Sequence, residues 1–168
     1  MATHAEWAKG YARQALADYD VYQKLQPQEV PEGHKLLFLQ MACEKLVKAH
    51  LCGTGTDPAT LQTSHAYVAK PLPVLLRQHA TLINFTGPKA RAALQYAKHL
   101  CQEIELLAPA VRRGGNRPDN CEYPWEDAAG MLHVPLDWAF TPSQLLAQPQ
   151  GRTFLKLVRS AIDRLAAT

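Results

Sequence analysis

The sequence predicts an all-α protein: an up-and-down bundle of four to five helices with a long ordered loop before the last helix. Apolar residues recur at spacings of three and four along most of the chain, which is the period of an amphipathic helix. No stretch alternates apolar and polar residues with β-branched side chains, so strands are not expected. Antiparallel helices joined in succession indicate a bundle.

The first two helices are expected over about residues 3–25 and about residues 32–51. Thr3 and Glu6 form a capping-box pair that begins the first helix. Aromatic and alanine side chains share one face of that helix: Trp7, Tyr11, Ala15, Tyr19 and Tyr22. The second helix is apolar nearly all round, as expected of a central helix, and Glu44 and Lys48 form an i,i+4 pair on it.

The remaining helices follow from breakers and apolar stripes. Residues 58–83 are expected to hold one or two short helices broken by Pro71 and Pro73. A longer helix is expected over about residues 86–107, with Thr86 as its cap. A single turn at about 142–147 and a last helix at about 149–166 complete the chain, which we interpret as one domain over residues 1–168.

Bulk composition fits an ordinary water-soluble protein. The net charge of +3 is too weak to predict nucleic-acid binding unless the charge is clustered. No secretory signal begins the chain, and the longest apolar run, Leu36–Leu39, is far short of the roughly 20 residues of a membrane span. The four cysteines form no Cys-x-x-Cys pair, so free thiols and a cytoplasmic location are expected. No two histidines have the spacing of metal ligands on a helix, so neither a metal nor a cofactor is expected.

The stretch 108–126 is the most informative in the chain, and it opens a long irregular insertion over residues 108–142. Three prolines and a Gly-Gly pair forbid a helix there. Loops held by a rigid scaffold often carry function. The candidates for nucleotide or RNA binding are therefore the polar and aromatic residues of this stretch: Arg112, Arg113, Arg117, Asn120, Glu122, Tyr123 and Trp125.

Two interpretations of this loop remain open. Gly114 and Gly115 beside the arginines form either an anion nest with a guanidinium clamp or, as we favour, a plain turn with solvated arginines. Tyr123 and Trp125 either dock the loop onto the bundle through their large apolar area, as we favour, or provide a stacking platform for a base. No nucleophile has a sequence-adjacent base, and no Gly-x-Ser-x-Gly elbow is present.

The stretch from Glu32 to Leu51 resembles the second helix of the HEPN domain family. That helix carries the pattern Gln-x-Ala-x-Glu-Lys-x-x-Lys-Ala-x-Leu, whose places are held here by Gln40, Ala42, Glu44, Lys45, Lys48, Ala49 and Leu51. Residues 7–18 resemble the family's first helix, and Thr63-Ser-His-Ala resembles the start of its third. The string Glu122-Tyr-Pro-Trp resembles the Arg-Tyr-Pro string of many members. The resemblance covers most of residues 5–126.

The resemblance implies a homodimeric helical bundle and two kinds of function. Many HEPN proteins are metal-independent endoribonucleases, often toxins paired with a nucleotidyltransferase or components of antiphage defence. Their signature is Arg-x(4–6)-His, and no arginine here has a histidine at that spacing: His99 is too far from Arg91, and His79 too close to Arg77. We therefore expect a non-catalytic module that dimerises or binds a partner protein, and that also binds nucleotide or RNA.

The alternative is an endoribonuclease or nucleotide-processing variant. In it, Arg112, Arg113 or Arg117 stabilises phosphate charge while Tyr123 or Glu122 handles protons. Geometry separates the two hypotheses. Arginines that converge in a cleft with Tyr123 or a histidine favour the enzyme, whereas arginines in solvent with both aromatic residues buried favour the module.

Overall fold

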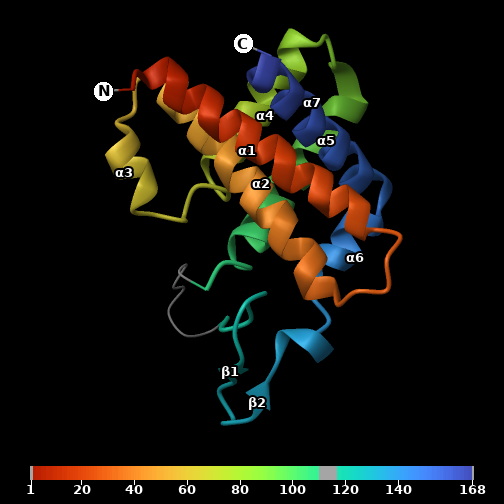
Figure 1. Cartoon of the computed structure of the whole chain (residues 1–168). Helices are drawn as coiled ribbons and strands as arrows, with labels where there is room; N and C mark the ends of the chain where they lie inside the picture. Colours follow the sequence, from red (N-terminus) through yellow and green to blue (C-terminus); the bar gives the residue numbers. More distant parts are fainter. Residues whose placement is uncertain (1, 110–116, 168) are drawn as a thin grey trace.

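The computed structural model describes residues 2–109 and 117–167, and it is a helical bundle (Figure 1). Its long helices are α1 (His4–Leu25), α2 (Glu32–Gly53), α4 (Pro71–Leu82), α5 (Gly87–Glu105) and α7 (Pro149–Ala167). Two short helices, α3 (Pro58–Gln62) and α6 (Thr141–Ala147), lie in the connections. The all-α prediction is confirmed, and the long helices lie close to the expected ranges.

Helices α1 and α2 form the most extensive helix pair, an antiparallel hairpin closed by the proline-containing turn after Leu25 (Figure 1). The predicted capping box begins α1: Thr3 Oγ1 accepts from the Glu6 amide at 3.2 Å, and Glu6 Oε2 accepts from the Thr3 amide at 2.7 Å. Lys45 of α2 forms an ion pair with the buried Asp18 of α1, which adds a polar link to this apolar pair.

Helix α2 is the central helix because its apolar residues surround it. Leu36, Leu39, Leu46 and Val47 are fully buried. They belong to one continuous core that also takes side chains from α1, α4, α5, α6 and α7. A helix buried on nearly all sides needs neighbours all round, and this explains why α1, α4, α5, α6 and α7 all contact α2 or a helix beside it.

The prolines in the middle of the chain begin a helix rather than break one. Pro71 and Pro73 stand in the first turn of α4, where a proline removes an amide that would have no helical partner. Residues 58–83 therefore hold two helices, α3 and α4, joined by an extended connection that includes His65. Thr86 precedes α5 as its cap residue, but its side chain makes no capping hydrogen bond.

The expected long loop contains a short antiparallel ribbon that the sequence did not indicate. Strand β1 (Trp125–Glu126) pairs with β2 (Leu132–His133), and a 3-10 turn at Pro135–Asp137 follows. The ribbon projects from one end of the bundle (Figure 1). Asp127 closes its turn, because its carboxylate accepts hydrogen bonds from the amides of Ala129 and Met131. Strands of two residues are too short to show a period of two, so no pattern in the sequence could indicate them.

The four cysteines are free and buried, as expected of structural thiols. Burial raises the pKa of Cys121 to about 12 and also raises the pKa of Cys43. Thiols with raised pKa values are poor nucleophiles at neutral pH. Within the described ranges, no helix combines the length and the apolar character needed to cross a bilayer.

Gly151 is predicted to be essential for the packing of α7 on α6. A Cβ atom at this position would lie 2.6 Å from Leu146 Cα and would also clash with the Leu145 carbonyl oxygen. We expect Gly151→Ala to lower the free energy of unfolding by about 1–3 kcal/mol, as overpacking does. Gly10→Ala is the matched control, because nothing lies within 4 Å of its added Cβ. The control should stabilise α1 by about 0.5–1 kcal/mol. Equal urea midpoints for the two variants would contradict this packing.

Candidate functional site

Three segments distant in sequence meet around a pocket of about 480 Å³. Helix α2 supplies Gln40, Met41, Glu44 and Lys45. The connection between α3 and α4 supplies His65, and the segments that flank residues 110–116 supply Ala108, Pro109, Glu122 and Tyr123. The volume lies within the range of small-molecule sites. The pocket therefore joins the polar face of α2 to the loop that the sequence singled out.

The floor of the pocket is a buried carboxylate with three partners. Glu44 is 6% exposed and accepts from Lys48 Nζ at 2.6 Å and from Gln40 Nε2 at 3.0 Å. His65 Nδ1 lies 3.1 Å from Glu44 Oε1. The Lys48 ammonium also lies 5.6 Å from the centre of the Tyr67 ring. The predicted i,i+4 pair of α2 is confirmed. It belongs to a larger network with Gln40 and His65, and a buried ion pair needs such additional partners.

His65 presents its other ring nitrogen away from this network. An ionised carboxylate can only accept hydrogen bonds, so the Nδ1 of His65 donates to Glu44. In the neutral ring, Nε2 is then an acceptor, and the ring is exposed at the pocket. The sequence placed His65 only before an apolar stretch, and it could not reveal the contact with Glu44 across 21 positions.

Asn120 positions the two candidate residues that follow it. Its Oδ1 accepts from the amide of Glu122 at 2.9 Å and from the amide of Tyr123 at 2.8 Å. Its Nδ2 donates to the Pro118 carbonyl at 3.2 Å, and the Cys121 amide bonds to the Leu107 carbonyl. Asn120 is thus a buried residue that fixes the backbone of Glu122 and Tyr123, and its side chain is used within the protein rather than for contact with a ligand.

Arg117 is a structural clamp. Its guanidinium donates to both carboxylate oxygens of Asp119, at 2.9 and 3.1 Å, and to Glu103 Oε2 on α5 at 3.0 Å. The hydrogen bonds with Asp119 and then Glu103 raise its pKa further above the ordinary value. Two carboxylates already neutralise this charge, so the Arg117 guanidinium is engaged within the protein rather than free to hold a phosphate. Arg112 and Arg113 lie outside the described residues.

The two aromatic residues of the loop have opposite environments. Trp125 is 7% exposed and belongs to the core of the bundle, where it packs edge-on against Trp138 at 5.3 Å between ring centres, so the docking interpretation is confirmed for this residue. It is wrong for Tyr123, which is 60% exposed and lines the pocket. The two residues differ because Trp125 lies in strand β1, whereas Tyr123 precedes the strand. Tyr123 therefore keeps its platform role as a candidate.

A second histidine lies beside a serine hydroxyl, as in a nucleophile–base pair, but its ring nitrogen nearest the serine carries a hydrogen. His79 Nε2 lies 2.9 Å from Ser160 Oγ. Arg164 Nε, which can only donate, bonds to His79 Nδ1 at 3.2 Å. The neutral ring therefore carries its hydrogen on Nε2 and donates it to Ser160, so His79 cannot take the proton of that hydroxyl.

Comparisons with known proteins add no assignment. No known protein family matches this chain, and no curated protein or solved structure is significantly similar to it. Among the described residues, no group of three or more potential ligands is placed to hold a metal ion. The pocket itself is therefore the feature that points to a function.

Removing Glu44 is expected to destabilise the fold, because Lys48 would remain as a buried and unpaired charge. Glu44→Ala should lower the free energy of unfolding by about 3–5 kcal/mol, the cost of breaking a buried ion pair from one side. The double change Glu44→Leu with Lys48→Met removes both charges and should lose less than the single change. Urea unfolding of the two variants measures this. A double variant less stable than the single one would show that the ion pair does not dominate at this site.

The folded protein is expected to lose stability as the pH falls below about 6.5. Burial, and then the Arg164 guanidinium, lowers the pKa of His79 below its ordinary value of 6.5, and the same two causes lower the pKa of His50. The unfolded chain then binds protons that the folded chain does not, so stability is complete above about 6.5 and falls as the pH drops through that value. Thermal melts of His79→Gln should show a smaller decrease than wild type, and the exposed His99→Gln should show an unchanged one. Equal decreases in wild type and His79→Gln would contradict this origin.

Proposed function

We propose that this chain is a helical binding module, of the kind that the HEPN resemblance implies, which holds a base of a nucleotide or of single-stranded RNA in the Tyr123 pocket. The observation that carries the proposal is the meeting of an exposed tyrosine ring with the Glu122 carboxylate and the His65 imidazole in one pocket. Aromatic rings stack on every base because every base has a π-face.

The charges of the pocket favour a base over a phosphate. Lys48 is paired with Glu44 and Lys45 with Asp18, so both lysines near the pocket are neutralised. Among the described residues, the Glu122 side chain has no ion pair, and with His65 Nε2 it offers hydrogen-bond acceptors. A planar, uncharged ligand with N–H donors suits such a site. Guanine fits best, because its N1–H and exocyclic amine can both donate to one carboxylate.

The backbone of the site is held in place by contacts within the protein, so it does not need to be ordered by a ligand. Asn120 holds the backbone of Glu122 and Tyr123, and the Arg117 clamp ties residues 117–119 to α5. A preorganised site loses little entropy when it binds. The further expectations, a homodimer and a nucleotidyltransferase or defence partner, belong to this proposal and rest on the resemblance alone.

RNA cleavage is the second candidate function, and one observation favours it. Glu44 orients His65 through Nδ1 and leaves Nε2 at the pocket, which is the arrangement of a histidine general base. The described residues place no unpaired arginine beside it, since Arg117 is held by Glu103 and Asp119. We therefore propose base binding as the function. Cleavage of RNA by the purified chain would favour the nuclease instead.

Titration calorimetry with guanosine and with a short single-stranded RNA tests the proposal. Tyr123→Ala should weaken binding about tenfold or more, since stacking contributes about 1–3 kcal/mol per base, while Tyr123→Phe keeps the ring and should bind like wild type. Glu122→Gln should weaken guanosine more than uridine, which lacks the paired donors.

Two results would count against base binding. Equal affinities of wild type and Tyr123→Ala for guanosine would show that the base does not bind in this pocket. Cleavage of labelled RNA in the presence of EDTA, lost in His65→Gln but kept in His34→Gln, would establish the nuclease instead. His34 is the matched control because it is an exposed histidine that does not line the pocket.

A further inference from the structure

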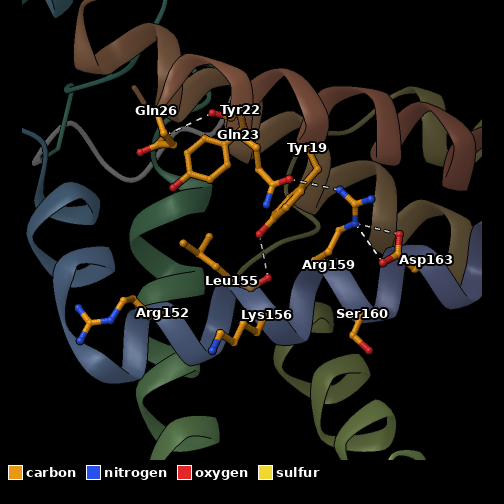
Figure 2. A pocket seen from close by; sticks show the side chains of 10 residues that line it. All are labelled: Tyr19, Tyr22, Gln23, Gln26, Arg152, Leu155, Lys156, Arg159, Ser160 and Asp163. Atoms are coloured by element: carbon orange, nitrogen blue, oxygen red, sulfur yellow. Dashed lines mark hydrogen bonds and ion pairs between the residues drawn. The ribbon is translucent and has the colours of Figure 1, made fainter. Parts of the chain in front are cut away.

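A second pocket, of about 520 Å³, lies between the C-terminal half of α1 and helix α7, away from the residues of the Tyr123 pocket. Helix α1 and Gln26, the residue that follows it, supply aromatic and amide side chains to the pocket: Tyr19, Tyr22, Gln23 and Gln26 (Figure 2). Helix α7 supplies mainly polar and charged ones: Arg152, Leu155, Lys156, Arg159, Ser160 and Asp163 (Figure 2). We call this pocket the α1/α7 groove.

The charge of α7 is concentrated at this groove. The helix has four basic residues and one acidic residue, although the whole chain carries a net charge of only +3. Arg152, Lys156 and Arg159 follow each other at steps of four and three, so they share one face of the helix. At a rise of about 1.5 Å per residue, Arg152 and Lys156 are about 6 Å apart along the axis.

One of these cations is already used inside the protein. Arg159 donates to Asp163 Oδ1 at 2.9 Å, to Asp20 Oδ1 at 2.6 Å and to Gln23 Oε1 at 3.4 Å (Figure 2 shows its bonds to Gln23 and Asp163). It also lies 5.8 Å from the centre of the Tyr19 ring. Arg159 thus fixes the groove wall, and the two carboxylates that could repel an anion are both occupied by it.

Four other side chains of the groove have N–H or O–H groups available to donate hydrogen bonds to a ligand. Lys156 is exposed and has no ion pair or hydrogen bond within the described ranges, and Arg152 uses one guanidinium nitrogen on the Ala147 carbonyl. Because Gln23 Oε1 faces Arg159, the amide hydrogens of Gln23 remain free to donate. Ser160 Oγ accepts from His79, so its own hydroxyl hydrogen is also available.

The aromatic rings of the groove are buried and are not open to a partner. Tyr19 is 2% exposed and Tyr22 is 4% exposed, because the hydroxyl of Tyr19 bonds to the Leu155 carbonyl and both rings belong to the core. An acidic helix would need an apolar face to bury, as helices that dock in grooves do. With both rings buried, the groups that the groove presents for recognition are its cations and hydrogen-bond donors, and these suit a compact anion.

We propose that the α1/α7 groove binds a ligand that carries two or more linked phosphoryl groups, with Lys156 and Arg152 as the charged contacts and Gln23 and Ser160 as neutral donors. Guanidinium groups hold phosphate oxygens in a fork, and the ammonium acts as a point charge. Two cations about one helical turn apart match a ligand longer than a single phosphate. This site is independent of the Tyr123 pocket, which recognises a base.

Calorimetric titration of the full chain with pyrophosphate and with orthophosphate at low salt tests the groove. Pyrophosphate should bind at least about tenfold more tightly than orthophosphate, and added salt should weaken it. Lys156→Gln should weaken pyrophosphate about tenfold, the effect of losing one charge-assisted hydrogen bond. Lys98→Gln is the matched control, because Lys98 is an exposed helical lysine on α5 that does not line the groove.

Three results would overturn the proposal. The first is no binding of pyrophosphate, and the second is equal weakening by Lys156→Gln and Lys98→Gln. The third is binding of a hexaglutamate peptide as tightly as pyrophosphate in a Lys156-dependent manner, which would make the groove a site for acidic peptides. Guanosine binding should be unchanged in Lys156→Gln, so failure of the groove and failure of the Tyr123 pocket are distinguishable. Since Lys156 is exposed, the variant should melt within a few degrees of wild type.

Discussion

The carboxylate of Glu44 is the constraint on which the candidate site depends. It lies on the central helix, is nearly removed from water, and is stabilised by Lys48, Gln40 and His65. A buried charge tolerates only those surroundings that satisfy it. The connection between α3 and α4 is therefore tied to α2 at His65, and the floor of the pocket is set by the same contacts that relieve the buried charge.

A second set of polar contacts fixes the loop on the other side of the pocket. Arg117 bridges Asp119 to Glu103 of α5, and Asn120 holds the amides of Glu122 and Tyr123. Arg117 and Asn120 are candidate ligand-binding residues in the sequence, but in the structure their side chains position neighbouring residues. The result is that the exposed ring of Tyr123 is presented by a rigid backbone, next to the ordered floor around Glu44.

The helices could be predicted from the sequence because they depend on local signals. Spacing of apolar residues, the Thr3–Glu6 capping box and the prolines each act within a few residues, and the helix bounds agree to within about two positions. The site depends on contacts across the chain, such as the one between His65 and Glu44. The sequence also could not predict that Tyr123 is exposed while Trp125 is buried, because burial depends on contacts with residues that are distant in the sequence.

We propose that a base occupies the pocket between Glu44 and Tyr123. The most direct measurement is an NMR titration of the ¹⁵N-labelled chain with guanosine, which has no phosphate and so does not report on the α1/α7 groove. Binding of a base there should change the shifts chiefly of the amides of Met41, His65, Glu122 and Tyr123, which belong to three separate segments of the pocket. Shift changes confined to α7, or none at millimolar guanosine, would contradict it.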